Sequence, residues 1–200
     1  MSFVLAVMTP GRCIIAGDTQ LNDDNGPIKA TGIKVLPINN HTAIGITGRY
    51  CEYLDAYNEV ISQCTNEPSY GKIKELFSAS LKEHCPQYNA VIVQCNTACN
   101  YFTLLSSGGT DEGIYVAADG TVKALLPPGI TTEECQRIMT PSNDLKDSMI
   151  SCIRGVSKIS NTVNAKVFGL EFSPSELRSF TDGITYDQID FRIRMKENRS

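Results

Sequence analysis

The N-terminal part of the chain is organised around four short apolar runs separated by turn-forming residues. A Pro-Gly turn follows the first run, and an Asn-Asn pair separates the third from the fourth. Apolar runs of four to eight residues bounded by such turns are typical of β-strands. We therefore expect two strand pairs here, residues 3–8 with 12–17 and residues 34–38 with 42–47.

The hydrophobic period then changes from that of strands to that of helices. Apolar residues recur three and four positions apart, which places them on one face of an amphipathic helix. The first such face is Tyr50, Leu54, Tyr57 and Ile61, and the second is Ile73, Leu76, Phe77 and Leu81. Ser69 is the expected start of the second helix, which should end before Pro86.

Strands return after the second helix and are interrupted by two more helices. The expected strands are 90–94, 101–105, 113–117, 121–125, 166–172 and 176–180, with an Asp119-Gly120 turn. A short helix is expected at 131–139, and a longer one after Pro141, capped by Ser142. Strand blocks separated by helix pairs predict an α+β fold in which one sheet packs on another and helices cover the outside of each.

Composition is that of one compact domain and excludes two classes of protein. The 200 residues are 42% hydrophobic, which suits a single domain over residues 1–190 with a flexible basic tail at 191–200. A net charge of −4 argues against nucleic-acid binding, which needs a basic face. The apolar runs are shorter than the ~20 residues that span a bilayer, and the N-terminus lacks a signal-peptide pattern. We therefore expect a cytoplasmic protein without a membrane segment.

Eight cysteines are spread through the apolar stretches, and we expect them to be reduced, buried residues. The pair Cys95 and Cys99 is the only local one, at a hairpin turn, and only His41 and His84 could complete a metal site. A zinc site needs a second ligand pair, so no metal is expected. Each histidine fits a surface position better than a catalytic one.

The candidate chemistry is a nucleophile and its base on one residue, Ser2. If Met1 is removed, Ser2 carries both a hydroxyl and a free α-amine at the start of a strand. A serine hydroxyl needs an adjacent base, and an α-amine with a pKa of ~7.7–8.0 can serve. Asp18 and Lys34 follow at equal spacings of sixteen residues, and Gly48 ends the strand at 42–47. We expect Lys34 to act as a cation fixed by Asp18, and the Gly48 N–H to be an oxyanion donor.

These residues carry a resemblance to a known family. Ser2, the run Ile14-Ile15-Ala16-Gly17-Asp18, Lys34 and the strand end at Gly48 resemble proteasome β-subunits and the HslV-type protease, which are N-terminal-nucleophile hydrolases. The resemblance covers about a quarter of the chain. It implies a four-layer αββα sandwich and amide-bond hydrolysis by Ser2, without a cofactor. The family usually has threonine as the nucleophile, where this chain has serine.

The resemblance also implies a substrate pocket and partners. The residues beside the nucleophile that would line the pocket are Leu21, Gly32, Leu36, Ile46 and Tyr50, although core packing could equally account for Leu36 and Ile46. An apolar pocket predicts cleavage of unfolded polypeptide after hydrophobic residues. A homo-oligomeric ring fed by an ATP-dependent unfoldase is the implied assembly.

Two alternatives to the peptidase stay open at this point. The family supports its nucleophile with an aspartate-containing stretch, but residues 160–164 of this chain contain none. Ser160, Asn161 or Thr131 would have to accept some of those hydrogen bonds. An inactive proteasome-like structural or binding subunit is therefore one alternative, and a small-molecule amidohydrolase of the same superfamily is the other.

Overall fold

The computed structural model describes the chain except for residues 1, 24–25, 65–67, 98, 116–120 and 189–200. The described residues form two five-stranded sheets, a two-stranded hairpin and four α-helices, and all strand pairs are antiparallel. The α+β prediction is confirmed.

The first sheet has the order β10-β1-β2-β11-β12, formed by Thr121–Leu125, Val4–Thr9, Arg12–Asp18, Val167–Ser173 and Glu176–Asp182. The second has the order β5-β6-β7-β8-β9, formed by Val35–Asn39, Thr42–Gly48, Tyr88–Cys95, Asn100–Ser106 and Gly109–Tyr115. The hairpin is β3 (Gln20–Asp23) with β4 (Gly26–Thr31). The helices are α1 (Tyr50–Gln63), α2 (Tyr70–His84), α3 (Thr132–Ile138) and α4 (Leu145–Val156), followed by a short 3₁₀ helix, Tyr186–Gln188.

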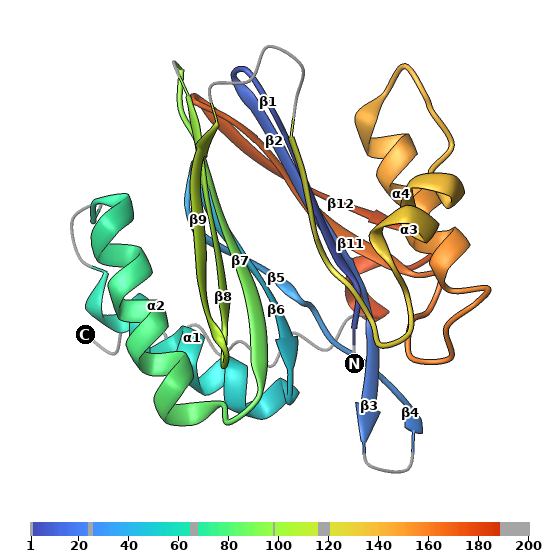
Figure 1. Cartoon of the computed structure of the whole chain (residues 1–200), viewed down its shortest axis with the longest axis horizontal. Coiled ribbons are helices and arrows are strands. Elements are labelled where there is room, and N and C mark those ends of the chain that lie inside the picture. Colours follow the sequence, from blue (N-terminus) through green and yellow to red (C-terminus); the bar gives the residue numbers. More distant parts are fainter. Residues whose placement is uncertain (1, 24–25, 65–67, 98, 116–120, 189–200) are drawn as a thin grey trace.

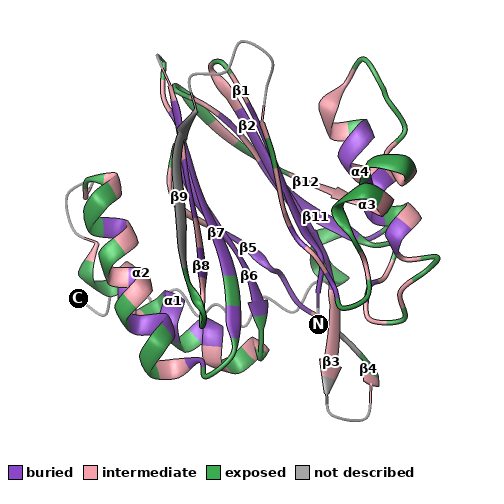
Figure 2. Cartoon of the chain, viewed as in Figure 1, coloured by how far each residue is buried: buried purple, intermediate pink, exposed green. Residues whose placement is uncertain are grey.

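The two sheets face each other, and each carries a helix pair on its outer face (Figure 1). Helices α1 and α2 cover the second sheet, while α3 and α4 cover the first. Buried residues line the central strands β1, β2, β6, β7 and β11 and the inward faces of the helices (Figure 2). Within the described part of the chain, no helix is both long enough and apolar enough to cross a membrane.

Strand β1 shows how the sequence produces this layering. Val4, Ala6 and Met8 belong to the core cluster shared with the second sheet, whereas Leu5 and Val7 belong to the cluster beneath α3 and α4. Both faces of the strand are therefore buried. This explains why its sequence is a continuous apolar run instead of an alternating one.

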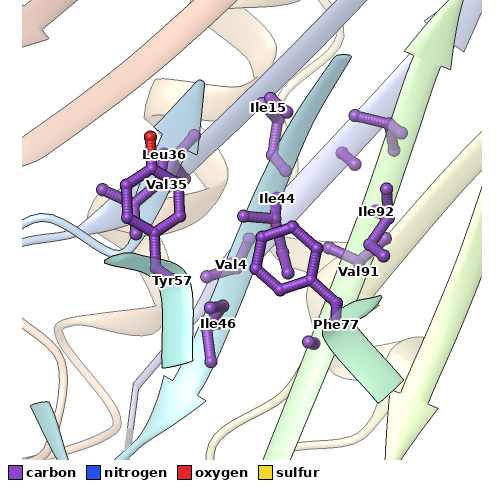
Figure 3. Packing of buried hydrophobic residues seen from close by; sticks show 14 of the residues in the cluster. Val4, Ile15, Val35, Leu36, Ile44, Ile46, Tyr57, Phe77, Val91 and Ile92 are labelled. Carbon is purple, nitrogen blue, oxygen red and sulfur yellow. The ribbon is translucent and has the colours of Figure 1, made fainter. Parts of the chain in front are cut away.

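The cluster shared with the second sheet contains ring side chains from both covering helices (Figure 3). Tyr57 of α1 and Phe77 of α2 stack with ring centroids 6.3 Å apart, near Ile44 and Ile46 of β6. Gly45 separates these two isoleucines, and a Cβ there would lie only 2.5 Å from Val4 Cγ1 of the facing sheet. The absence of a side chain at this position allows the two sheets to approach closely.

Most predicted elements lie within two or three residues of the observed ones, but β9 begins at Gly109, four residues before the strand predicted at 113–117. Three further expectations need correction or completion. The N-cap of α4 is Asp144, which accepts a hydrogen bond from Lys146 N–H, and not Ser142. Hairpin β3-β4 was not predicted, because it is short and largely polar. The cysteines are free, but Cys51 is exposed and Cys64 and Cys99 are only partly buried.

Other expectations were met or lie outside the described residues. Ser69 caps α2, as predicted, by accepting a hydrogen bond from Lys72 N–H. The expected Asp119-Gly120 turn, the last two residues of the strand at 113–117 and the tail at 191–200 fall outside the described residues.

Candidate active site

The Asp18 carboxylate lies at the end of β2 and is fully buried. Its Oδ1 accepts a hydrogen bond from Phe3 N–H at 2.8 Å, and its Oδ2 accepts one from Gln20 N–H at 2.9 Å. The backbone N–H of Asp18 donates in return to the Phe3 carbonyl at 3.2 Å. The carboxylate is thereby fixed against the residue that follows Ser2.

Lys34 supplies the charge that a buried carboxylate needs. Its Nζ donates to Asp18 Oδ2 at 2.7 Å, and its side chain is only 1% exposed. Burial lowers the pKa of Lys34 from its usual 10.5, while the charge of Asp18 and its hydrogen bond act in the opposite direction. Breaking such a pair leaves one buried charge without a partner, so each residue requires the other.

The backbone around Lys34 is held from both sides. The Lys34 carbonyl accepts a hydrogen bond from Ile46 N–H of β6 at 2.8 Å, and Tyr53 of α1 donates its hydroxyl to the Ile33 carbonyl at 2.8 Å. A Cβ on Gly17 would lie 3.1 Å from the Phe3 carbonyl oxygen and 3.4 Å from Lys34 Cβ. Glycine at position 17 therefore leaves room for the lysine to reach Asp18.

Ser2 lies at the entry to β1 and is 6% exposed. It is joined directly to Phe3, whose N–H and carbonyl both bond to Asp18. The structure thus brings Asp18 and Lys34 together as a buried pair, and places the buried Ser2 one residue before the backbone group that binds the Asp18 carboxylate.

Gly48 is the exposed last residue of β6, two positions after Ile46, which bonds to Lys34. Its φ of +158° is rarely adopted by residues with a side chain, and an added Cβ would lie 3.1 Å from the Gln87 carbonyl oxygen. This conformation explains the glycine independently of any catalytic role. Gly48 is connected to the buried group through strand β6.

The predicted pocket residues separate into two sets. Leu21 and Tyr50 converge on Gly32, where a Cβ would lie 2.6 Å from Tyr50 Cε2 and 2.9 Å from Leu21 Cδ2. Both side chains are partly exposed. Leu36 and Ile46 are fully buried in the core cluster (Figure 3), so core packing accounts for them.

Two residues that sequence reasoning missed are Thr19, which directly follows Asp18, and Asn164, which contacts Thr19. Thr19 is fully buried, and its N–H is shared between Asn164 Oδ1 at 3.2 Å and the Lys166 carbonyl at 3.0 Å. The Asn164 Nδ2 group donates to Thr19 Oγ1 at 3.3 Å. The sequence signal for Asn164 is weak: an asparagine before a strand is typical of a local turn. In the structure its side chain does accept the Lys166 N–H in such a turn.

The residues expected to support the nucleophile have local roles instead. Ser160 Oγ bonds to Thr162 Oγ1 at 3.0 Å, and Asn161 is exposed. Thr131 forms the capping box of α3 with Glu134. Among the described residues, Asn164 is the one from this loop that contacts the Asp18 turn through its side chain.

One group of possible metal ligands occurs within the described residues, on the outer helices. Atoms of Glu59, Glu83 and His84 lie within 4.8 Å of one another. Glu59 accepts hydrogen bonds from Ser80 and from His84, the latter at 3.1 Å, and the Ser80 hydroxyl is the main cause of its lowered pKa. These contacts account for the group as a polar link between α1 and α2.

Comparison with known proteins gives no match, either to a family or to a curated protein.

Proposed function

We propose that the protein is a peptidase that uses Ser2, freed by removal of Met1, to hydrolyse peptide bonds. The observation that carries this proposal is the buried ion pair of Asp18 and Lys34, which is hydrogen-bonded to the backbone directly after Ser2. A buried ion pair is an expensive feature for stability alone, since apolar residues of similar size are often at least as stabilising. Perturbed charges of this kind are common at functional sites.

The proposed reaction begins with the neutral α-amine of Ser2, which takes the proton from its own Oγ as the oxygen attacks the substrate carbonyl carbon. The carbonyl oxygen becomes an oxyanion, to which the Gly48 N–H would donate. Collapse breaks the C–N bond, and the α-ammonium returns the proton to the leaving amine. Water then attacks the Ser2 ester by the same route and releases the acid.

In this scheme Lys34 acts only through its charge. A cation near Ser2 favours the neutral form of the α-amine and stabilises developing negative charge on Oγ. Asp18 keeps that charge in place by opposing the effect of burial on the pKa of Lys34. Asp18 is thus a positioning residue for Lys34.

The αββα sandwich of the N-terminal-nucleophile hydrolases is the fold that goes with this proposal. The order of the elements and the helix pairs outside two facing sheets support it. So does the end of β6 at Gly48, immediately before α1. We further propose a cytoplasmic ring of identical subunits, supplied with unfolded chains by an ATP-dependent unfoldase.

Substrate choice follows from the surroundings of Gly32. Leu21 and Tyr50 offer an apolar and aromatic surface there, so we propose cleavage after hydrophobic residues. A preference for acidic or basic residues in a panel of fluorogenic peptides would contradict this part of the proposal.

An inactive proteasome-like subunit is the second candidate function. It is favoured by the loop at 160–164, which brings the neutral amide of Asn164 to the site and contains no carboxylate. A small-molecule amidohydrolase would share the chemistry of Ser2 but would cleave small amides and not peptides.

One experiment separates these functions. The N-terminal residue of the purified protein is determined by mass spectrometry, and hydrolysis of peptides and of small amides is then measured. We expect Ser2 at the N-terminus and peptide hydrolysis, whereas a chain with an uncleavable N-terminal tag should be inactive because its Ser2 nitrogen is an amide. Equal hydrolysis by tagged and untagged chains would overturn the mechanism, and a processed but inactive chain would favour the structural subunit.

A further inference from the structure

The loop between α4 and β11 is hydrogen-bonded to the turn that follows Asp18. Asn164 binds Thr19 through both ends of its amide: Oδ1 accepts the Thr19 N–H at 3.2 Å, and Nδ2 donates to Thr19 Oγ1 at 3.3 Å. The same Oδ1 accepts the Lys166 N–H at 3.1 Å, which ties the amide to the start of β11. The amide is therefore held from two elements that are distant in the sequence.

Thr19 connects the Asn164 side chain to the ion pair of Asp18 and Lys34. It separates Asp18 from Gln20, and the Gln20 N–H donates to the same carboxylate oxygen, Oδ2, that binds Lys34. The Thr19 carbonyl also accepts the Gly32 N–H at 3.1 Å, two residues before Lys34 in the chain. A shift of the Thr19 backbone would therefore move the carboxylate and the segment that carries the lysine.

A second contact holds the loop at the same place. Asn22 of β3 donates its Nδ2 to the Thr162 carbonyl at 3.1 Å. The loop is thus attached on both sides of Gln20, which explains how a segment without regular structure can hold a buried turn. The amide of Asn164 is neutral at every pH, so its hydrogen bonds to Thr19 do not depend on the ionisation of the side chain.

We propose that Asn164 is a positioning residue for the site, which holds the Thr19 backbone so that the Asp18 carboxylate stays bonded to Lys34. Its kinetic consequence rests on the proposed peptidase function, whereas its effect on the ion pair does not.

The test compares wild type with Asn164→Ala, Asn164→Asp and an exposed control, Asn143→Ala. The first readout is hydrogen exchange of the Lys34 ammonium, followed by ¹H–¹⁵N NMR, because a buried, hydrogen-bonded ammonium exchanges slowly. We expect exchange at least about tenfold faster in Asn164→Ala, and near wild type in Asn164→Asp, which keeps an acceptor for the Thr19 N–H. Thr19→Val, which loses only the hydroxyl partner, should give a smaller change in the same direction and serves if Asn164→Ala does not fold.

The second readout is peptide hydrolysis by the same variants. We expect Asn164→Ala to lower kcat on the order of 10²-fold with little change in KM, since misplacement of a catalytic group by about 1 Å has costs of this size. Asn164→Asp should restore most of the rate, and Asn143→Ala should match wild type.

The outcomes are distinguishable. Unchanged ammonium exchange in Asn164→Ala and Thr19→Val, even with a lower melting temperature, would overturn the inference and leave Asn164 a merely structural residue. Absence of hydrolysis by the processed wild-type protein would overturn the proposed function instead. In that case the ammonium readout still decides the role of Asn164.

Discussion

At the scale of single residues, the buried ion pair dominates the site. Lys34 and Asp18 are almost completely removed from solvent, and the carboxylate also receives two backbone N–H groups. Hydrogen bonds of this kind satisfy the lone pairs that a buried carboxylate would otherwise leave unmatched. The pair is therefore a rigid unit that contacts the chain directly after Ser2.

This unit predicts a bell-shaped dependence of kcat/KM on pH. The α-amine of Ser2 must be neutral, so the rate should rise with pH through the pKa of the amine, which is near ~8 when unperturbed. Lys34 must be charged, and burial lowers its pKa from 10.5. As the pH rises, Lys34 should therefore lose its charge, and the rate should begin to fall, before pH 10.5 is reached. The measurement is peptide hydrolysis from pH 6 to 11, and a rate that still rises up to pH 10.5 would contradict a role for the Lys34 charge.

The sequence predicted this group only in part. Ser2, Asp18 and Lys34 lie within 33 residues, on elements whose order the apolar runs indicate. Asn164 is 145 residues away from Thr19, and its polar loop looks like any surface turn. Long-range placement of a loop depends on tertiary packing, which a local pattern does not contain.

At the scale of elements, the periodicity of apolar residues predicted the helices and the buried strands well. Each of these elements packs one or both of its faces against the core, so its buried positions are apolar at regular intervals. Hairpin β3-β4 lacks such a pattern, since it extends from the body of the molecule (Figure 1). The start of α4 was misplaced because two polar residues, Ser142 and Asp144, lie close enough together for either to serve as the cap.

The two residues therefore allow a direct test of the cap. Asp144→Ala should lower the free energy of unfolding by about 1 kcal/mol, because it removes the acceptor of the Lys146 N–H, together with the exposed 3.4 Å ion pair that the same oxygen forms with Arg12. Ser142→Ala should cost less than about 0.5 kcal/mol, since among the described residues the exposed Ser142 hydroxyl bonds to the Asp144 N–H alone, at 3.2 Å. Urea unfolding measures both, and an equal or larger cost for Ser142→Ala would refute the assignment.

At the scale of the whole molecule, the two sheets approach closely where β6 faces β1 and β2. The predicted layering could be read from apolar runs, but the spacing of the sheets could not, because it depends on which small residue faces which large one. Gly45 is the clearest example, with Val4 and Ile15 on the facing sheet at 2.5 and 3.0 Å from the position of an added Cβ.

Gly45→Ala should consequently force the sheets apart. Overpacking of this kind costs about 1–3 kcal/mol, and the displaced Val4 lies two residues from Ser2, so peptide hydrolysis should also fall. The matched control is Gly71→Ala in α2, where nothing lies within 4 Å of an added Cβ. That variant should be neutral or more stable by up to about 1 kcal/mol, and equal effects of the two changes would contradict this account of the sheet interface.

The role of Ser2 as the nucleophile is tested by comparing peptide hydrolysis by processed wild type, Ser2→Ala and Ser2→Thr. Threonine keeps the hydroxyl next to the α-amine, so Ser2→Thr should retain activity within about tenfold. Ser2→Ala keeps the amine but has no hydroxyl, and its kcat/KM should fall by at least about 10³-fold. Hydrolysis by Ser2→Ala at the wild-type rate would show that Ser2 is not the nucleophile.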